Sequence, residues 1–362
     1  APAAEPIVLI APFNMTGPEA VLDAPCYRGA ELAAEKLNAR GGVLGRPIQL
    51  VVVDTASDVE STAGKVEAAL KSHPGAIAGI GFTYSTYALD AGRVFQKAKL
   101  PFITPGATAP DLPRKVGDEM FLAAYGDDAQ ALVMAKFARN QLKLGHVALW
   151  IDESSVYTRT VGGFFDKFFR QLGGTVDRRT YAKDVTNFRR FIEAFKAAKQ
   201  KPEAIYAASM PRSAVPLIQQ VRAAGIEVPL LSGDGWDDEE IVIASKRKNI
   251  NSIYFTTHRF LGLDTPAMKA FVKAYTRKFG GPPPNAFAPL AFDTVNLLAD
   301  AIKRIGSTEP EAIRAALANT RDFQGVVGKI AYVPGRQVPN KAVSVIQIAH
   351  GVETLVWTWS PQ

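Results

Sequence analysis

The sequence predicts an α/β protein of two lobes, each a doubly wound parallel sheet with helices on both faces. Short apolar runs alternate with longer helical patterns, which is the order of strand–helix–strand units. The alternation restarts after a short irregular stretch around residues 121–127, so the chain contains two α/β halves. Its 362 residues, 47% hydrophobic and 21% charged, are enough for two hydrophobic cores.

The first half opens with the apolar run from Ile7 to Ala11, which has the length and character of a buried strand. A helix is expected at 27–39, where Ala30 and Leu37 fall on one apolar stripe, and the glycine pair after residue 40 ends it. The other elements expected in this half are strands at 48–53, 76–80 and 100–103 and helices at 59–70 and 87–97.

The second half repeats the alternation from residue 129 onward. The expected helices are 129–140, 161–172, 188–198 and 214–224, and the expected strands are 147–151, 175–181, 204–208 and 228–231. A strand at 253–256 and three helices at 266–279, 288–305 and 310–318 follow. Because no strands separate these three helices, they cannot form another doubly wound domain, and we expect them to pack on the first lobe. The extended segments 328–332, 343–348 and 353–359 are expected to form a hairpin at a sheet edge.

Charge and composition exclude several classes of partner. The net charge is +7, from 42 Lys and Arg against 35 Asp and Glu, but the basic residues are scattered, and clusters such as 246–248 lie in helical patterns. We therefore expect no nucleic-acid partner. No stretch approaches the roughly 20 apolar residues of a membrane helix. The sequence starts at Ala1 without Met, as after removal of a secretion signal, although a shortened chain would begin in the same way. Cys26 is the only cysteine, which excludes an intrachain disulfide.

Motifs of cofactor and catalytic chemistry are missing from the sequence. The glycines at 79 and 81 lack the third glycine of a dinucleotide fingerprint, since Tyr84 stands in its place. Neither a phosphate-binding loop nor a nucleophile elbow occurs. The four histidines are too far apart for metal-ligand spacing and are expected at the surface or at helix caps: His73, His146, His258 and His350. We therefore expect no cofactor, no metal and no enzymatic activity.

Polar loops follow successive predicted strands and form the candidate site. Ligands of parallel α/β sheets bind outside the carboxyl ends of the strands, and helix N-termini there favour anions. The segment 81–86 carries three aliphatic hydroxyl side chains, of Thr and Ser, where a helix begins, and the segment 100–112 contains a Pro-Gly turn. The candidate residues at these strand ends are Thr83, Gly106, Thr108, Tyr157, Met210, Asp234 and Phe287. Each also has a plain structural interpretation, as a helix cap, a core side chain or a turn residue.

Six segments together give the chain a resemblance to a known family. They are residues 16–18, 28–33 with 38–42, 103–108, 221–225, 233–237 (Gly-Asp-Gly-Trp-Asp) and 291–295. In their order and spacing the sequence resembles the periplasmic solute-binding proteins of branched-chain amino-acid ABC transporters, nearly from end to end. The resemblance implies the type I periplasmic binding fold, with two lobes joined by a hinge of three crossovers. The lobes would be 1–122 with 257–329, and 123–256 with 330–362.

The same resemblance implies what the candidate residues do. An amino acid, branched-chain or otherwise aliphatic, would be captured in the interlobe cleft and delivered to a membrane ABC permease by a periplasmic, monomeric protein. Its carboxylate would meet the hydroxyl and N–H groups of Thr83 and Thr108. Its ammonium would meet the Gly106 carbonyl, the Thr108 hydroxyl and Asp234, which stands where some members carry Glu. The remaining residues of the implied site are Tyr157, which closes over the ligand, Leu22, Met210 and Phe287, which line the side-chain pocket, and the neighbours Tyr84 and Ala107.

Two departures from the family and two alternatives stay open. Some relatives carry aromatic residues at the Leu22 and Met210 positions, so the ligand side chain is not fixed, and the family's first-lobe disulfide is missing here. An aromatic or other small carboxylate, or an amide, is the first alternative ligand. Asp234 distinguishes an amino acid from a plain carboxylate, since its acid group attracts an ammonium and repels a ligand that carries only a carboxylate. A cytosolic ligand-sensing regulator on the same fold is the alternative from another class.

Overall fold

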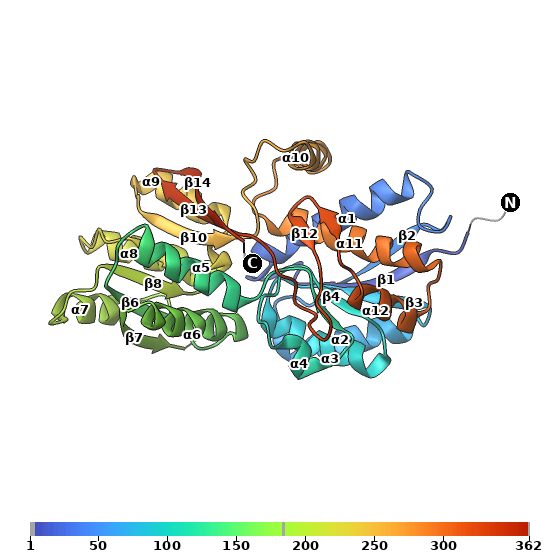
Figure 1. The fold of residues 1–362 in the computed structure, drawn as a ribbon, viewed down its shortest axis with the longest axis horizontal. Coiled ribbons are helices and arrows are strands. Elements are labelled where there is room, and N and C mark those ends of the chain that lie inside the picture. The colour runs from blue at the N-terminus through green and yellow to red at the C-terminus, as the bar shows by residue number, and fades with distance from the viewer. Residues whose placement is uncertain (1–3, 183–184, 361–362) are drawn as a thin grey trace. The chain divides into compact units, whose positions relative to one another are not determined.

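A computed structural model describes residues 4–182 and 185–360 of the chain (Figure 1). The chain divides into two compact units. Unit 1 comprises Ala1–Gly126 and Leu261–Lys341, and unit 2 comprises Asp127–Phe260 and Ala342–Gln362, so the chain passes between them three times. The sequence-based boundaries at 122, 256 and 329 fall somewhat earlier than these.

The sheet of unit 1 is wholly parallel, with the strand order β2-β1-β3-β4-β5. Its strands are β1 (Ile7–Phe13), β2 (Ile48–Asp54), β3 (Ala76–Ile80), β4 (Phe102–Thr104) and β5 (Met120–Leu122). Every residue of β3 and β4 is buried, as expected of strands covered on both faces. The carboxyl ends of β3 and β4 therefore lie side by side, which positions the loops that follow them.

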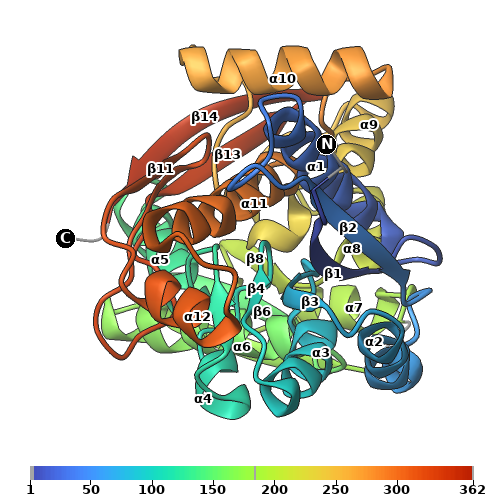
Figure 2. The ribbon, with the colours of Figure 1, turned by 90° about the vertical axis from the view of Figure 1, so that its right-hand side faces the viewer.

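Helices cover both faces of this sheet. They are α1 (Ala20–Asn38), α2 (Val59–Ser72), α3 (Ser85–Ala98), α4 (Leu112–Val116), α10 (Pro266–Phe279), α11 (Phe287–Ile305) and α12 (Pro310–Ala318). Figure 2 shows α1 and α11 on one face and α2 and α3 on the other. The backbones of α1 and α11 approach closely, because a Cβ on Gly29 would lie 1.8 Å from the carbonyl oxygen of Ala288. As predicted, the three helices after residue 261 belong to unit 1.

Helix α1 begins at Ala20, well before the predicted start at residue 27. Pro25 lies inside this helix, near its N-terminus. The early start places Leu22 and Asp23 on the helix, where both are buried. Cys26 is fully buried within α1, and burial together with the charge of Asp23 raises the pKa of its thiol.

Unit 2 contains a seven-stranded sheet with the order β14-β13-β10-β9-β8-β6-β7. Its strands are β6 (His146–Asp152), β7 (Thr175–Tyr181), β8 (Ala204–Ala208), β9 (Leu230–Ser232), β10 (Ile253–Thr257), β13 (Val343–Ala349) and β14 (Val352–Trp359). The pairs from β7 to β10 are parallel, whereas β13 pairs antiparallel with both β10 and β14. The last two strands thus form the predicted hairpin at the sheet edge.

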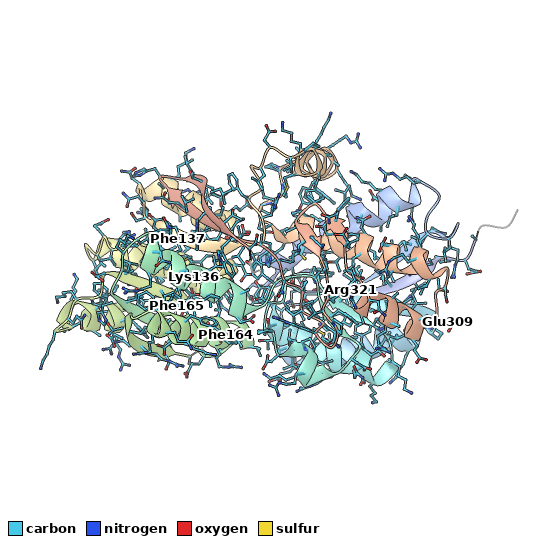
Figure 3. The ribbon with its side chains drawn as sticks, in the orientation of Figure 1. Lys136, Phe137, Phe164, Phe165, Glu309 and Arg321 are labelled. Atoms are coloured by element: carbon cyan, nitrogen blue, oxygen red, sulfur yellow. The ribbon has the colours of Figure 1, made fainter. Side chains whose placement is uncertain are left out.

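The helices of unit 2 pack on this sheet through aromatic side chains. They are α5 (Asp127–Asn140), α6 (Val156–Gln171), α7 (Arg189–Ala197), α8 (Pro211–Ala223) and α9 (Glu239–Lys248), and a short 3-10 helix, η1 (Asp234–Trp236), follows β9. Phe165 of α6 stacks on Tyr206 of β8 with ring centroids 3.9 Å apart. On α5, Phe137 packs between Tyr254 and Trp357, and the neighbouring Lys136 lies over the ring of Trp359 (Figure 3).

The segment 328–332 does not join the C-terminal hairpin, contrary to the prediction. Instead β12 (Gly328–Ile330) pairs with β11 (Phe323–Gly325) in a separate two-stranded sheet of unit 1. The chain after β12 stays with unit 1 because Tyr332 Oη donates a 2.8 Å hydrogen bond to the Leu122 carbonyl and Lys341 Nζ donates to that of Ala123. Residues 330–341 therefore belong to unit 1, although the prediction gave them to the second lobe.

Within residues 4–182 and 185–360, no helix has both the length and the apolar character needed to cross a membrane.

Candidate functional site

In unit 1 the structure brings three of the predicted site residues together at the ends of β3 and β4. Thr83 follows β3, and Gly106 follows β4. A Cβ on Gly106 would lie 2.7 Å from Cδ1 of Phe287 and 3.0 Å from Cγ2 of Thr83, so both side chains pack directly against the Gly106 backbone. Phe287 reaches this point from the first turn of α11. We call Thr83, Gly106, Thr108 and Phe287 the unit 1 cluster.

Thr83 is bound to a buried acid that the sequence analysis did not single out. The Thr83 N–H and its hydroxyl each donate a 2.7 Å hydrogen bond to Oδ1 of Asp23. Oδ2 of Asp23 accepts from the backbone N–H and the side-chain amide of Asn14 at 2.9 and 2.8 Å. The predicted role of the Thr83 N–H and hydroxyl as donors to a ligand carboxylate is therefore not what this structure presents, because Asp23 already accepts both.

Burial dominates the electrostatics of Asp23. Loss of hydration raises the pKa of this carboxyl to about 7, although the hydrogen bonds from Asn14 and Thr83 act in the opposite direction. The carboxyl therefore changes its charge near neutral pH. This carboxyl accepts hydrogen bonds from Thr83, a residue of the unit 1 cluster.

Thr108 keeps donors that are not committed to the protein. It is buried, and among the described residues neither its N–H nor its hydroxyl makes a hydrogen bond. The N–H groups of the residues on either side donate hydrogen bonds: that of Ala107 to Thr104 Oγ1 at 3.1 Å and that of Ala109 to Ser85 Oγ at 3.2 Å. Asn285 adds another donor beside Phe287, since its Oδ1 accepts from the Phe287 N–H while its buried Nδ2 meets no acceptor in the described part of the chain.

Leu22 and Tyr84, the other predicted residues of unit 1, are also buried. Leu22 lies on α1 directly before Asp23. Tyr84 is the residue before α3, and its ring packs edge-on against Tyr87 with centroids 6.0 Å apart.

In unit 2 the structure brings Tyr157 and Asp234 together at the turn after β9. Tyr157 stands in the first turn of α6, and its hydroxyl accepts a 2.9 Å hydrogen bond from the Gly235 N–H. A Cβ on Gly233 would lie 2.4 Å from the same hydroxyl oxygen, so glycine is needed for the ring to approach. Met210, at the start of α8, is half-buried and lies next to Ser209, whose Oγ accepts from Trp236 Nε1 at 2.8 Å.

Asp234 is held by two side chains from other elements. Its Oδ1 accepts from Gln130 Nε2 at 2.8 Å, and its Oδ2 lies 2.9 Å from His258 Nε2. Gln130 also donates from Nε2 to Asp127 Oδ1, and its Oε1 accepts from the Asp234 N–H. We call Asp127, Gln130, Tyr157, Asp234 and His258 the unit 2 cluster. The expectation that His258 is a surface or cap residue is wrong, since its side chain is fully buried against Asp234.

Tyr157 of the unit 2 cluster and the nearby Tyr206 stay neutral phenols. Burial, reinforced by the charges of Asp234 and Asp127, raises the pKa of Tyr157 well above its ordinary value, and burial followed by the same two acids does so for Tyr206. Both hydroxyls therefore keep their hydrogens at neutral pH. Chemically, this cluster offers carboxylate oxygens and hydroxyl groups to a cation. Among the described residues, no group of three or more His, Cys, Asp or Glu is placed to hold a metal ion.

Comparison with known proteins identifies the family of the chain. The family described as periplasmic binding protein matches residues 7–352 of the chain. The chain belongs to the periplasmic binding protein family. An amino acid binding protein of Pseudomonas aeruginosa is 28% identical over 87% of this chain and 82% of its own length.

Solved structures of this family share the fold of the chain. The leucine binding protein LivK of Thermotoga maritima has a TM-score of 0.90 and 26% identity, covering 98% of this chain and 99% of its own. The substrate binding protein LivJ of Streptococcus pneumoniae, solved with isoleucine, has a TM-score of 0.90 and 26% identity, covering 99% and 100%. This periplasmic binding protein therefore has the fold class that its sequence predicts.

Sequence analysis of this periplasmic binding protein missed the residues that hold the predicted ones. They are Asp23, Gln130, His258 and Asn285. Asp23 and Gln130 lie on helices, where an isolated polar side chain normally faces solvent. His258 carries a readable signal, because it directly follows β10 at the same sheet edge as Asp234.

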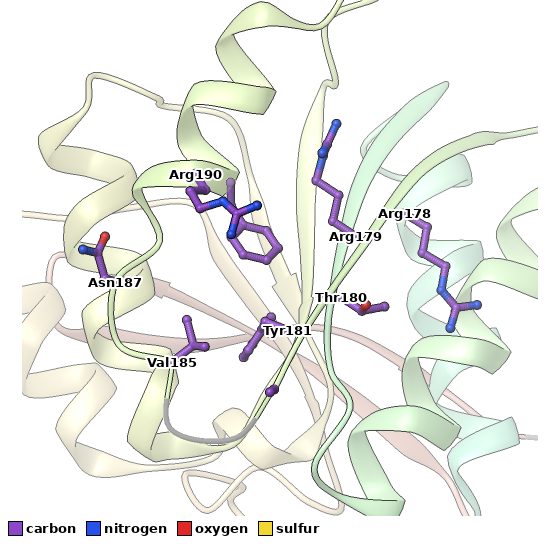
Figure 4. A pocket seen from close by; sticks show the side chains of 9 residues that line it. Arg178, Arg179, Thr180, Tyr181, Val185, Asn187 and Arg190 are labelled. Carbon is purple, nitrogen blue, oxygen red and sulfur yellow. The ribbon is translucent and has the colours of Figure 1, made fainter.

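A separate pocket of about 680 Å³ lies beside β7 and the start of α7 (Figure 4). Arg179, Arg190 and Phe191 line it, with Arg178 on the strand toward α6. Two of these arginines are near acids, since Arg178 lies 3.9 Å from Asp166 and Arg179 lies 3.6 Å from its strand neighbour Asp177. The charge of this pocket is therefore partly balanced, and we assign it no ligand.

Proposed function

We propose that this protein captures an aliphatic amino acid, of the leucine, isoleucine or valine class, in the periplasm and delivers it to the permease of an ABC transporter. The observation that carries the proposal is the buried Asp234 carboxylate at the end of β9, beside the Tyr157 hydroxyl. A buried acid at a ligand-binding edge favours a cation, and an amino acid supplies one as its ammonium. The names of the similar proteins from Pseudomonas and Thermotoga support the same class of ligand.

The carboxylate of the amino acid would be bound by the unit 1 cluster. Thr108 offers its N–H and hydroxyl, and Asn285 Nδ2 offers an amide hydrogen, so an anion would find donors without a full positive charge. Each hydrogen bond to a charged group contributes about 1.5–3 kcal/mol. Thr83 would contribute to this site through its Cγ2 beside Gly106, since Asp23 accepts its hydrogens.

The apolar side chains predicted to line the site support an aliphatic ligand side chain. Phe287 packs on Gly106, and Leu22 and Met210 are the other predicted lining residues. Met210 is only half-buried, and a methionine adapts its shape to differently branched ligands. We therefore expect several aliphatic amino acids to bind, with no chemical change to the ligand.

Calorimetry on ligand-stripped protein tests the proposal. Leucine, isoleucine and valine should bind, and Asp234→Asn, which keeps the shape and removes the charge, should weaken leucine binding about 30- to 1000-fold. The matched control is Asp322→Asn, an acid exposed at its ion pair with Lys329, which should leave the affinity unchanged. Ligand recovered after incubation should be intact. Equal affinity of the wild type and Asp234→Asn would refute the amine-binding role.

A second candidate ligand is a small carboxylate without an amine. The observation in its favour is that both Asp234 oxygens already have partners, Gln130 and His258, so an ammonium is not needed to satisfy them. The discriminating ligands are leucine and 4-methylpentanoate, which differ in the amine alone. Tighter binding of 4-methylpentanoate or benzoate than of leucine would favour this second candidate.

A further inference from the structure

His258 contacts Asp234, the acid that we propose as the binding partner of the ligand ammonium, and its imidazole can gain or lose a proton. The Nε2–Oδ2 distance is 2.9 Å, and the two side chains are 0% and 2% exposed. Because Oδ2 is a carboxylate oxygen, Nε2 carries the hydrogen of this bond. The other ring nitrogen therefore decides whether His258 is neutral or cationic.

A cationic His258 and a ligand ammonium compete for the same negative charge. A buried carboxylate is stabilised by one nearby cation, and a second cation in the same low-dielectric surroundings is repelled. The other groups at Asp234 bring no charge: Gln130 Nε2 donates a hydrogen bond to Oδ1, and Tyr157 stays a neutral phenol. Two states thus give the Asp234 carboxylate one cationic partner: in one it is protonated His258 without an amine, and in the other it is the ligand ammonium beside neutral His258.

We propose that His258 is a positioning and specificity-determining residue that holds Asp234 Oδ2 and releases one proton to solvent when an amine ligand binds. This proposal rests on the proposed function, because it takes Asp234 as the ammonium partner. In the exchange, the imidazolium loses a proton from the nitrogen that faces away from Asp234, and the ligand ammonium replaces its charge. A ligand without an amine causes no such release.

Several other titratable groups lie in or beside the unit 2 cluster, and the experiment must separate them from His258. Asp127 and Tyr157 approach from α5 and α6, and Tyr206 lies on β8. Asp237 accepts from Thr257 Oγ1 at 2.5 Å, and the guanidinium of Arg259 follows in the chain. The tyrosines stay protonated at neutral pH, since burial raises the pKa of both. Burial also raises the pKa of Asp23 to about 7 and the pKa of Asp293 and Asp238 to about 6, so proton release is assigned to His258 only through its own variant.

Titration calorimetry in buffers of different ionisation enthalpy measures the proton exchange directly. At pH 5.5–6.5, leucine binding to the wild type should release up to about one proton, and the affinity should rise up to about tenfold per pH unit before it levels off. His258→Gln keeps an amide donor for Asp234 and should abolish both effects. His73→Gln, outside both clusters, and Asp23→Asn should leave the proton release unchanged. 4-Methylpentanoate should release no proton.

The outcomes separate this proposal from the proposed function. Leucine binding without proton release in the wild type, or release that persists in His258→Gln, overturns the role of His258 and leaves the amino-acid function standing. Absence of leucine binding at every pH overturns both. If His258→Gln fails to fold, an NMR titration of the His258 ring in the wild type gives the same answer: saturating leucine should lower its pKa, and an unchanged pKa overturns the proposal.

Discussion

Replacing Asp23 by asparagine should change the way in which stability depends on pH. Asp23 is fully buried on α1, and its two carboxylate oxygens accept four hydrogen bonds from Asn14 and Thr83. Burial raises its pKa from 3.8 to about 7, and this difference is equivalent to about 4 kcal/mol. Asparagine has nearly the same shape but cannot ionise, so it isolates this contribution.

The sign follows from the direction of the shift. Because the folded state holds the Asp23 proton more tightly than the unfolded state, Asp23 stabilises the fold most below pH 3.8. That contribution decreases as the pH rises through about 7. The free energy of unfolding of the wild type minus that of Asp23→Asn should therefore fall by about 4 kcal/mol between pH 4 and pH 8, or about 1.4 kcal/mol per pH unit until about pH 7.

Urea denaturation at several pH values measures this difference, and hydrogen exchange of the segments around β3 and α1 reports it for unit 1 alone. Subtracting the variant is necessary because burial also raises the pKa of Asp293 and Asp238 to about 6. Asp322→Asn is the control: its hydrogen bond with Lys329 lowers the pKa of that carboxyl, so it should cause no change above pH 4.5. If the free energy of unfolding of the wild type minus that of Asp23→Asn stays constant from pH 4 to pH 8, the Asp23 carboxyl does not bind a proton near neutral pH.

Two further predictions concern packing and turn structure. Gly106→Ala should weaken leucine binding and destabilise unit 1 by about 1–3 kcal/mol, because the added Cβ would lie 2.7 Å from the Phe287 ring. Calorimetry measures the binding and urea denaturation measures the stability. Gly64→Ala is the control, since a Cβ at Gly64 would meet open space. Asp293→Ala should destabilise the β11–β12 turn by about 2–4 kcal/mol, because the N–H groups of Val326 and Val327 both donate to the Asp293 carboxylate at 2.7 Å. Hydrogen exchange of these two amides should become faster in the variant. Unchanged exchange would contradict the proposed role of Asp293 in holding the turn.

Element boundaries could be predicted from the sequence where a specific residue marks the end. Helix α10 matches its predicted range because Thr265 caps the Met268 N–H at one end and Gly280, with φ of 81°, ends the other. Helix α9 was missed, although Asp238 caps it through the Glu240 N–H, since the helix is short and mostly polar. The strand β5, three residues long, has too few side chains to show a period.

The candidate site could be predicted in part, by the rule that ligands bind at the carboxyl ends of parallel strands. That rule selected Thr83, Gly106 and Asp234, and within each unit the structure places predicted residues beside one another. Their supporting partners could not be predicted, because they come from distant parts of the chain. Asp23 reaches Thr83 across 60 residues and Gln130 reaches Asp234 across 104, and no local pattern encodes such a pairing.

Both clusters share one physical feature, which bears on how a ligand is selected. In each, the residue at the strand end is fixed by a partner on a helix, Asp23 for Thr83 and Gln130 for Asp234. Groups fixed before binding lose little conformational entropy when a ligand arrives, so more of the contact energy appears as affinity. Fixed groups also cannot rearrange to suit a ligand of the wrong charge. Selection between an amino acid and a plain carboxylate should therefore depend on the charge of Asp234 and of its partner His258.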